Sequence, residues 1–564
     1  MADREYEVVI VGAGPVGLTL ALELGKRGVD VCVAERRRSR LRHPRASGLH
    51  VRTMELFRQH GIAEDIRRVG NLPLETWRGF GYMTRINQPD LGAIDLLSDP
   101  VQAEQARTAS PEQTAWCAQD ALEPFLREQI GRHPSVTVKL GLRGVGVEQD
   151  ERGVEVAFVE DDGRQSSIRA RYAVGADGGR SAIRQALGVE APTSVTFGDQ
   201  LNACFEADLL PFMGDRRYMV WWIINPDTVG GLLVYDGRRR WCYSWAFDPT
   251  KESIEDYPPE RCADVIRKAI GTDELEIKVE GLFPWSIDSA IADQFKVGRV
   301  LLAGDAAHRF PPTGGFGMNS GIQDSHNLGW KLHLVLRGLA DEGLLDSYAE
   351  ERRAVAVRNT TQVMHQTEMA AKVGWVMFDP EAIAKIESPE GEQVRQSIID
   401  GIPAQEEQYW TYGQQLGTIY ESTAVVGDGT APEESTIALY HPSAHPGARA
   451  PHLWLTGRDG ARTSTIDLLH SRFTLLSTPA GADWIGGARR AAARRGLELA
   501  TYTIGAEGDF QEEDGDWAKL YGVGPTGAVL VRPDGHVAFR AADSVDDPDR
   551  VLDDTLAKLL GTGV

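Results

Sequence analysis

The sequence predicts an α/β fold in which a Rossmann-like, dinucleotide-binding domain carries an interleaved antiparallel sheet, followed by a helical middle region and a second α/β domain. Three observations support this prediction. The N-terminus places a glycine-rich turn between an apolar strand and a helix, residues 195–285 alternate apolar with polar positions, and a new strand-and-helix pattern begins near residue 451. The length of 564 residues suits roughly two to four domains.

Composition limits the class of protein. The chain is 42% hydrophobic and 25% charged, as in ordinary globular proteins. Its net charge of −22 argues against a nucleic-acid partner. We find no apolar run long enough to span a membrane and no secretory signal, and therefore expect a cytoplasmic protein. The five cysteines form no CxxC or zinc-ligand pattern, which predicts reduced thiols and no metal site.

The first motif is a dinucleotide-binding fingerprint. A strand expected at residues 6–11 leads into a turn that reads Gly12-Ala13-Gly14-Pro15-Val16-Gly17. Gly12 allows the tight turn, Gly14 lets the backbone approach a pyrophosphate, and Gly17 lets the following helix pack on the strand. The next strand ends at Glu35, 23 residues after Gly12, where a carboxylate can bind both ribose hydroxyls of an adenosine. Together these features predict a bound dinucleotide.

A basic run follows this second strand directly. Its arginines are Arg36, Arg37, Arg38, Arg40, Arg42 and Arg45. Most charge runs are solvated loops, and that interpretation stays open here. Guanidinium groups also suit pyrophosphate and 2′-phosphate, and the run adjoins the adenosine-binding strand of an acidic chain. We favour phosphate contact by some of these arginines and expect them to capture NAD(P)H, with NADPH preferred.

Two further strand–turn–helix corners occur later in the chain. One contains Asp177-Gly178, a dipeptide that is common in turns. The other ends a strand at Gly304-Asp305, where the aspartate could bond the hydroxyls of a flexible polyol. The loop that follows is shaped by Pro311, Pro312, Gly314, Gly315 and Gly317. It opens into an amphipathic helix whose free N–H groups suit an anionic or electron-rich ligand, although a plain connection is the alternative.

Residues 195–285 are rich in aromatic side chains. Antiparallel strands are expected at 217–225, 230–236 and 240–247. Such a sheet can be an ordinary core, or it can form the wall of a pocket for a flat apolar ligand, and both can hold on opposite faces. The aromatic residues that we take as candidates for substrate contact are Trp222, Tyr235, Tyr243 and Trp285.

The domain boundaries are expected where these patterns change. The segments are a dinucleotide-binding domain at 1–190 with an insertion near 71–115, an aromatic-rich sheet at 191–285, the second part of the first domain at 286–370, a helical region and linker at 371–434, and a C-terminal domain at 435–564. No cysteine follows Cys262, so the last domain cannot perform thiol–disulfide chemistry. We expect it to have a structural or assembly role.

The three motifs resemble those of the single-component, class A FAD-dependent aromatic hydroxylases, which share the fold of para-hydroxybenzoate hydroxylase. The glycine-rich turn with Glu35 matches the first family motif, Asp177-Gly178 the second and Gly304-Asp305 the third, in the same order. The resemblance covers roughly residues 5–370 and is closest to the branch of phenol hydroxylase, dichlorophenol monooxygenase and the aromatic-polyketide hydroxylases. The C-terminal domain resembles the thioredoxin-like, cysteine-free extension of that branch.

The resemblance implies roles for particular residues. Asp177-Gly178 would serve both FAD and NAD(P)H, and Asp305 would bind the ribityl chain of FAD. Arg45 and Gln119 match family positions that contact the FAD phosphates. In the loop after Asp305, one residue would stack near the reactive flavin carbon, namely Pro312. The backbone that holds the pyrimidine edge of the flavin would be that of Gly317, Met318 and Asn319.

Departures from the family leave the catalytic base open. Phenol hydroxylase has an aspartate that deprotonates substrate where this chain has Ser47, which cannot be that base. His50, one helical turn further on, is a candidate base, although a single histidine more often has a structural role. Tyr243 lies near a family tyrosine that contacts substrate. Neither the base nor the substrate can be named from these residues.

The resemblance implies an NAD(P)H-dependent monooxygenase. NAD(P)H reduces FAD, O₂ adds at the flavin C4a position to give a hydroperoxide, and one oxygen atom passes to a phenolic ring. Only one dinucleotide fingerprint is visible, so the nicotinamide cofactor is expected to bind transiently. A flavin halogenase or dehydrogenase and a non-catalytic flavoprotein are the alternatives, and the halogenase signature Trp-x-Trp-x-Ile-Pro is absent. We expect a homodimer or a higher homo-oligomer.

Overall fold

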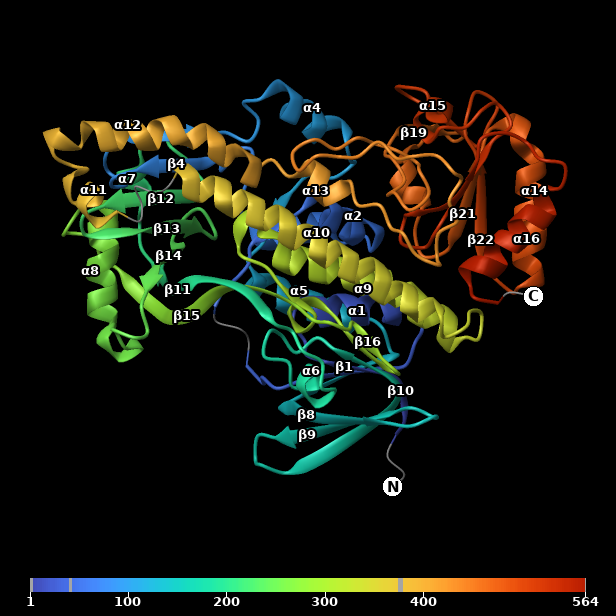
Figure 1. Ribbon diagram of the computed structural model, residues 1–564, viewed down its shortest axis with the longest axis horizontal. Helices are drawn as coiled ribbons and strands as arrows, with labels where there is room; N and C mark the ends of the chain where they lie inside the picture. Colours follow the sequence, from blue (N-terminus) through green and yellow to red (C-terminus); the bar gives the residue numbers. More distant parts are fainter. Residues whose placement is uncertain (1–3, 40–42, 374–378, 563–564) are drawn as a thin grey trace.

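The computed structural model describes residues 4–39, 43–373 and 379–562. Three regions follow one another along the long axis of the molecule (Figure 1). The aromatic-rich sheet lies at one end, a mainly parallel sheet with its helices lies in the middle, and the C-terminal domain, coloured orange to red, lies at the other end. No helix in this described part of the chain is long and apolar enough to cross a membrane.

The central sheet has the order β16-β17-β10-β1-β2-β7, and the hairpin β8–β9 extends it from β10. The strands from β17 to β7 run parallel, whereas β16 and β9 pair antiparallel with their neighbours. In chain order the strands are β1 (Tyr6–Val11), β2 (Val31–Glu35), β7 (Val136–Leu140), β8 (Leu142–Gln149), β9 (Val154–Glu160), β10 (Gln165–Gly175), β16 (Lys296–Val297) and β17 (Val300–Leu302).

A group of helices packs beside this sheet. Helix α1 (Pro15–Lys26) is almost wholly buried, because α9 (Phe316–Leu336) and α5 (Gln119–Ile130) pack against it. The long helix α10 (Leu344–Val373) crosses α9 (Figure 1). The remaining elements of this region are β3 (Gly48–Leu49), which pairs with β6 (Ala115–Trp116), and the helices α2 (Val51–Gln59), α3 (Ala63–Gly70), α4 (Pro100–Thr108) and α6 (Ala182–Ala186).

The second sheet has the order β18-β15-β11-β14-β13-β12-β4-β5. Its strands are β4 (Phe80–Met83), β5 (Asp90–Ile94), β11 (Thr193–Glu206), β12 (Val220–Asn225), β13 (Thr228–Val234), β14 (Arg240–Phe247), β15 (Lys278–Ile291) and β18 (His308–Arg309). Helix α8 (Pro259–Ile270) covers one face, where Cys262 and Ile266 join the core formed with Trp221 and Trp241. The short helix α7 (Leu210–Met213) follows β11.

The middle region covers one end of the other face of this sheet. Ile224 and Val229 of the sheet pack against Ala382, Ile386 and Ile398. These last residues belong to or flank α11 (Pro380–Lys385) and α12 (Glu392–Gly401), and they are followed by η6 (Ile402–Gln408) and α13 (Tyr412–Leu416).

The C-terminal domain has a four-stranded sheet of order β22-β21-β24-β25. The chain runs β21 (Phe473–Ser477), α14 (Ala482–Arg494), β22 (Leu499–Thr503), and later β24 (Ala528–Val531), β25 (Val537–Ala541) and α16 (Pro548–Leu559), the thioredoxin-like order. A small sheet adds β19 (Trp454–Gly457), β20 (Arg462–Ser464) and β23 (Phe510–Glu512), beside α15 (Trp517–Tyr521). Trp330 of α9 meets Phe473 with ring centroids 5.9 Å apart, so the domain shares a core with the central region.

Local geometry sets the start of two helices near the site. Helix α2 begins at Val51, because residues 48–49 pair with β6 and His50 has extended backbone angles. Helix α9 begins at Phe316, directly after the left-handed Gly315. Within residues 71–115, β4 and β5 pair and extend the second sheet.

Candidate active site

The carboxyl ends of four parallel strands meet at one edge of the central sheet. Strand β1 leads to Gly12, β2 ends at Glu35, β10 leads to Asp177, and β17 leads to Gly304 and Asp305. These strands are consecutive neighbours in the order β17-β10-β1-β2. Doubly wound sheets bind ligands in the crevice outside such strand ends. The three predicted motifs therefore form one continuous site, although they are far apart in the sequence.

The three glycines of the first turn have different surroundings. Gly12 has φ of 109°, and a Cβ there would overlap the carbonyl oxygen of Ala176. A Cβ on Gly17 would overlap the carbonyl oxygen of Gly12. A Cβ on Gly14 would meet only Glu123 Oε1, at 3.9 Å. Gly12 and Gly17 are thus required by the packing of the chain itself, whereas the space beside Gly14 is open to a ligand.

Glu35 turns its side chain back toward this glycine turn. Its carboxylate accepts hydrogen bonds from the backbone N–H groups of Ala13, at 2.8 Å, and Arg37, at 2.9 Å. Burial opposes ionisation, but these bonds and the charge of Arg37 hold the pKa of Glu35 below its ordinary value. Pro15 is the first residue of α1, where a missing N–H costs nothing. An ionised carboxylate therefore stands where the fingerprint places a ribose.

Arg45 and Gln119 lie together on a rigid turn. The backbone N–H of Gln119 donates to the carbonyls of Pro44 and Ala46, each at 2.9 Å. Arg45 itself has φ of 46° and an exposed side chain. The side-chain amide of Gln119 donates to Glu123 Oε1 at 2.7 Å. The turn holds Arg45 in a fixed place beside the N-terminus of α5.

The structure separates the arginines of the basic run. Arg37 pairs with Glu35, with Nε and Oε1 3.1 Å apart. Arg38 pairs with Asp161 at the turn between β9 and β10. Arg36 is exposed and has no ion pair among the described residues. Outside the described residues lie Arg40 and Arg42.

Asp177 and Gly178 turn the chain from β10 into α6. The carboxylate of Asp177 accepts hydrogen bonds from Ser181 Oγ and from the backbone N–H of Ala182, the latter at 2.7 Å, and so caps the helix. Gly178 has φ of 88°, with no atom of the described residues within 4 Å of where its Cβ would be. The side chain of Asp177 thus has a structural partner, and the open backbone of Gly178 faces the same edge as Gly12.

Asp305 is the exposed residue of a buried corner. Its side chain is exposed, while Gly304 and Ala306 on either side are buried. The surrounding protein raises the pKa of Asp305, and the charges of His308 and Arg45 oppose this shift. A carboxylate that is both closely surrounded and open on one side can be reached by a polyol chain.

The loop after Asp305 exposes its backbone. Pro312 and Gly315 are exposed, and Gly317 and Met318 are half-buried. Gly314 and Gly315 have φ of 70° and 72°, which only glycine adopts readily. A Cβ on Gly317 would find no described atom within 4 Å. The first turn of α9 therefore presents unobstructed N–H groups.

Asn319 fastens this loop to the segment before α2. Its side-chain amide donates to the carbonyls of Gly48, at 2.9 Å, and Gly315, at 2.8 Å. Its Oδ1 accepts the backbone N–H of His50 at 2.9 Å. Buried and fully bonded, Asn319 holds the backbone in place with its side chain.

His50 is buried beside the same loop. Its Nε2 lies 2.8 Å from the carbonyl oxygen of Gly314, and its ring meets the ring of Phe316 edge-on at 4.6 Å. Burial lowers the pKa of His50 to about 4, against the opposing bond to Gly314. The imidazole is neutral, so Nε2 donates to Gly314, and Nδ1 has no hydrogen-bond partner in the described residues.

One row of side chains crosses five strands on the face of the second sheet that α8 does not cover. The strand register aligns its members from β12 to β15 as Trp222, Gly231, Ser244, Asn202 and Phe283. A Cβ on Gly231 would be 3.3 Å from Trp222 Cζ3, so the indole ring lies across the glycine. Adjacent strands are about 4.8 Å apart, which makes the row about 19 Å wide. The row has aromatic ends and a polar centre.

Hydrogen bonds fix the polar atoms along this row. Trp222 Nε1 donates to Tyr409 Oη at 2.9 Å, which connects the sheet to the middle region. Trp285 Nε1 donates to Asn202 Oδ1 at 2.8 Å. Both indoles are half-buried. Because Asn202 Oδ1 is the acceptor, the other side-chain atom of Asn202 is the NH₂ group.

His43 joins this surface to the Arg45 turn. Its Nδ1 accepts the backbone N–H of Arg45 at 2.8 Å, and its ring meets that of Phe283 edge-on at 4.4 Å. Burial and the charge of Arg45 lower the pKa of His43 to about 4. The neutral ring therefore carries its proton on Nε2, which lies 3.5 Å from Asn202 Nδ2.

The placement of Tyr235 and Tyr243 does not support their predicted contact with substrate. Tyr243 lies on the opposite face, in the core under α8, and bonds Thr228 Oγ1 at 2.9 Å. Burial raises the pKa of Tyr243 above its ordinary value. Tyr235 is buried against Ala118 and Cys204. Of the four aromatic candidates, Trp222 and Trp285 are the half-buried ones.

Several residues of the site carry no recognisable signal in the sequence. His43, Asn202 and Tyr409 belong to no motif, and only the fold brings them to one surface. Glu123 lies one helical turn after Gln119, a spacing that could have indicated it. Across the described ranges, no group of three or more His, Cys, Asp or Glu side chains could hold a metal ion.

The chemistry of this edge fits FAD. It combines an ionised carboxylate beside a dinucleotide turn, open space beside Gly14, the exposed carboxylate of Asp305 and a helix N-terminus without a side-chain cap. Residues 5–363 match the FAD binding domain family, and residues 443–563 match the aromatic-ring hydroxylase C-terminal family.

Relatives over the full length agree. Tetracenomycin B2 monooxygenase-dioxygenase from Streptomyces olivaceus is 35% identical over 576 residues, which cover 99% of each chain. The solved structure of the flavin-dependent monooxygenase PieE, in complex with FAD and substrate, superposes with a TM-score of 0.90 at 32% sequence identity. The structure of aklavinone-11 hydroxylase with FAD and aklavinone superposes with a TM-score of 0.83 at 31% identity. Each superposition covers 100% of both chains.

The fold and the site define an FAD-dependent monooxygenase. The chain belongs to the FAD-binding aromatic-ring hydroxylase family, and is an FAD-dependent aromatic hydroxylase.

Proposed function

We propose that this enzyme hydroxylates a phenolic ring of a flat aromatic substrate, with NADPH or NADH as the transient reductant. The observation that carries this proposal is the row from Trp222 to Phe283. The sheet that bears it ends in β18, which directly follows the Asp305 corner, so the row and the cofactor edge belong to adjoining parts of the fold. The similar proteins named for tetracenomycin B2 and aklavinone support an aromatic substrate of this kind.

Bound FAD supplies the redox chemistry, taking electrons from the nicotinamide cofactor and activating O₂. The residues of the chain bind and orient the cofactor. Glu35 would bind the ribose, the open backbone at Gly14 the pyrophosphate, and Asp305 the ribityl chain. The N–H groups of residues 317–319 at the start of α9 would face the pyrimidine edge of the flavin and stabilise negative charge there.

Two N–H donors suit the oxygen of the phenol. Asn202 Nδ2 and His43 Nε2 both carry protons, because Trp285 and Arg45 occupy the acceptor atoms of the two side chains. Donors 3.5 Å apart cannot satisfy one another. A phenolate oxygen placed between them accepts from both, and such bonds favour the ionised phenol, which is the form more reactive toward an electrophilic oxygen.

This arrangement assigns a different role to His50. Its Nε2 donates to Gly314, and its lowered pKa of about 4 makes it a weak base at neutral pH. We therefore place His50 among the residues that hold the loop, and the ionisation of the phenol with the donor pair of Asn202 and His43.

The test is NADPH oxidation by the FAD-loaded enzyme in an oxygen electrode, with a panel of phenols that includes aklavinone. A substrate should accelerate NADPH oxidation and yield hydroxylated product in equal amount. Asn202→Leu should weaken binding of the ionised phenol, while Gln200→Leu, one row away on the same strand face, should not. Stimulated oxidation that yields only hydrogen peroxide with every phenol would contradict the proposal.

The remaining expectations stay predictions. These are the preference for NADPH, the cytoplasmic location and the homodimeric or higher assembly.

A further inference from the structure

One buried carboxylate fastens two separate parts of the FAD site to each other. Asp324, in the third turn of α9, is fully buried. It accepts the backbone N–H of Gly304 at 3.0 Å, and His308 Nε2 lies 2.7 Å from the same oxygen. Gly304 and His308 stand on either side of Asp305. The corner that carries Asp305 is therefore attached directly to α9, the helix that begins at the end of the exposed loop.

Arg352 of α10 completes this attachment. Its Nε donates to Asp324 Oδ1 at 2.6 Å, and one terminal nitrogen donates to the carbonyl oxygen of Ser320 at 3.1 Å. Ser320 lies next to Asn319 in the first turns of α9. Burial opposes ionisation of Asp324, but His308 and Arg352 lower its pKa to about 2. The guanidinium is a planar fork with fixed directions, so it sets the relative positions of the groups that it bonds.

The third bond of Arg352 leads out of the FAD-binding region. Its other terminal nitrogen donates to Tyr420 Oη at 2.9 Å. Tyr420 is buried and packs on His536 of the C-terminal domain, with ring centroids 4.2 Å apart. The backbone N–H of Tyr420 donates to the carbonyl of Gly447 at 2.9 Å, and Gly447 bonds back to β25 at Val537.

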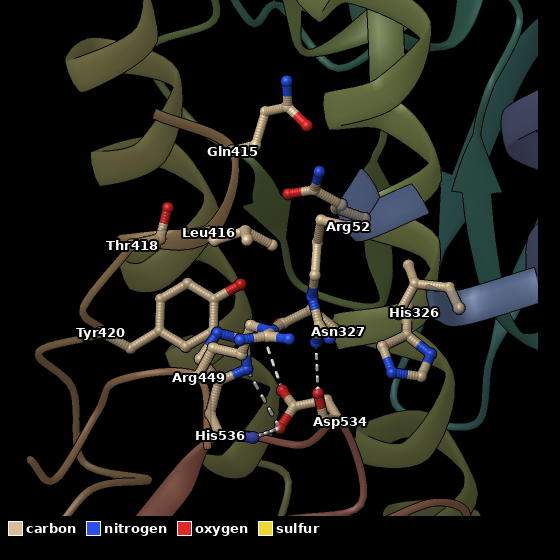
Figure 2. Close-up of a pocket in the computed structure, with 12 residues that line it drawn as sticks. Arg52, His326, Asn327, Gln415, Leu416, Thr418, Tyr420, Arg449, Asp534 and His536 are labelled. Atoms are coloured by element: carbon tan, nitrogen blue, oxygen red, sulfur yellow. Dashed lines mark hydrogen bonds and ion pairs between the residues drawn. The ribbon is translucent and has the colours of Figure 1, made fainter. Parts of the chain in front are cut away.

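Figure 2 shows this junction. Tyr420 and His536 line a small cavity together with Arg52 and Asn327 of the FAD-binding region and Asp534 of the C-terminal domain. The position of Tyr420 is therefore set by the way in which the C-terminal domain docks.

We propose that Asp324 and Arg352 are positioning residues of the FAD site, and that the docked C-terminal domain keeps Arg352 aligned through Tyr420. The proposal depends on FAD binding at this edge and not on the identity of the substrate. Misalignment of Arg352 would shift the Asp305 corner relative to the first turn of α9. It would then alter both the affinity for FAD and the environment of the flavin ring.

The first test is Tyr420→Phe, with Tyr521→Phe as its matched control. The substitution at Tyr420 keeps an aromatic ring on His536 but removes the hydroxyl oxygen that accepts from Arg352. Tyr521 is also buried and donates to the carbonyl oxygen of Pro451 at 2.7 Å, within the C-terminal domain. Both variants should lose thermal stability. Only Tyr420→Phe should raise the dissociation constant for FAD, by roughly tenfold, and shift the midpoint potential of the bound flavin.

A second variant keeps the proposal testable if Tyr420→Phe fails to fold. Arg352→Lys retains the positive charge beside Asp324 but cannot bond Ser320 and Tyr420 together. It should raise the dissociation constant for FAD and shift the flavin potential in the same direction. Wild-type values of both quantities in either folded variant would overturn the proposal. Neither readout requires substrate, so an error in the proposed substrate class cannot mimic this result.

Discussion

Replacement of Gly14 tests the cofactor site without disturbing the fold. The residue precedes α1 with φ of −76° and ψ of −178°, a conformation that any amino acid adopts. A Cβ there meets no described protein atom closer than Glu123 Oε1, at 3.9 Å. Gly14→Ala should therefore change the free energy of unfolding of the apo-protein by no more than about 1 kcal/mol.

The loss of FAD affinity can be estimated from the hydrogen bonds between the pyrophosphate and the backbone that a side chain at residue 14 would prevent. A side chain at Gly14 keeps the pyrophosphate from the N–H groups at the start of α1. A hydrogen bond to a charged group contributes about 1.5–3 kcal/mol, so each bond lost raises the dissociation constant roughly 10- to 150-fold. The assay is fluorescence titration of the apo-protein with FAD, and Gly14→Val should show a larger effect than Gly14→Ala.

Gly17→Ala provides the contrast. The Cβ that alanine adds at residue 17 would overlap the carbonyl oxygen of Gly12. The apo-protein of this variant should therefore already have a lower free energy of unfolding, without FAD present. A Gly14→Val protein that binds FAD with wild-type affinity would show that the dinucleotide lies elsewhere.

Three other perturbations address the remaining parts of the molecule. Neutral glutamines should replace three arginines of the basic run, namely Arg38, Arg40 and Arg42. The KM for NADPH should rise and depend less on salt, while the FAD content stays unchanged. An unaltered KM would mean that the run is only a solvated loop. His50 has a pKa of about 4 in the fold against 6.5 when unfolded, so the unfolded chain binds more protons between these values and stability falls as pH drops from 6.5 to 4. His50→Gln should remove up to about 3 kcal/mol of that loss by pH 4, measured by urea unfolding at several pH values, and an unchanged slope would show that His50 is not buried neutral. Arg532→Met leaves Glu351 with Lys331 as its remaining cation and leaves the buried Asp534 without its arginine. It should cost about 3–5 kcal/mol in chemical denaturation, against under about 1 kcal/mol for the exposed Arg490→Met; equal costs would refute a buried pair.

The cofactor edge could be predicted from the sequence because its motifs are local. A turn with Gly12 and Gly17, or a strand that ends at Asp305, depends on backbone space and chain direction within a few residues. The general rule that parallel strands end at one edge then brings these segments together. His43 and Asn202 could not be paired in this way, since 159 positions separate them and only the docking of the Arg45 turn against β11 makes them neighbours.

The sequence also could not predict which face of the aromatic-rich sheet is covered by a helix and which is left open. Alternation places Trp241, Tyr243 and Trp245 on one face of β14, but aromatic side chains occur on both faces of this sheet, since Trp222 and Phe283 lie on the other. Period-two patterning groups side chains without saying which group faces the cofactor. The position of α8 determines this, because the helix covers the face that carries Tyr243.

The C-terminal domain has no cysteine, so its effect on the enzyme has to come from how it docks. It supplies arginines to buried acids of the FAD-binding region: Arg449 Nε donates to Glu55 at 2.9 Å, and Arg532 bonds Glu351 at 3.0 Å. Buried ion pairs contribute little net stability, but they penalise strongly any arrangement that separates them. They therefore select one docked geometry, which is the geometry that holds Tyr420 against Arg352. On this proposal, a chain shortened before the domain would keep every cofactor motif and still lose their alignment. Glu55 and Glu351 would each lose an arginine partner, and Tyr420 would lose the contacts with Gly447 and His536 that hold it against Arg352.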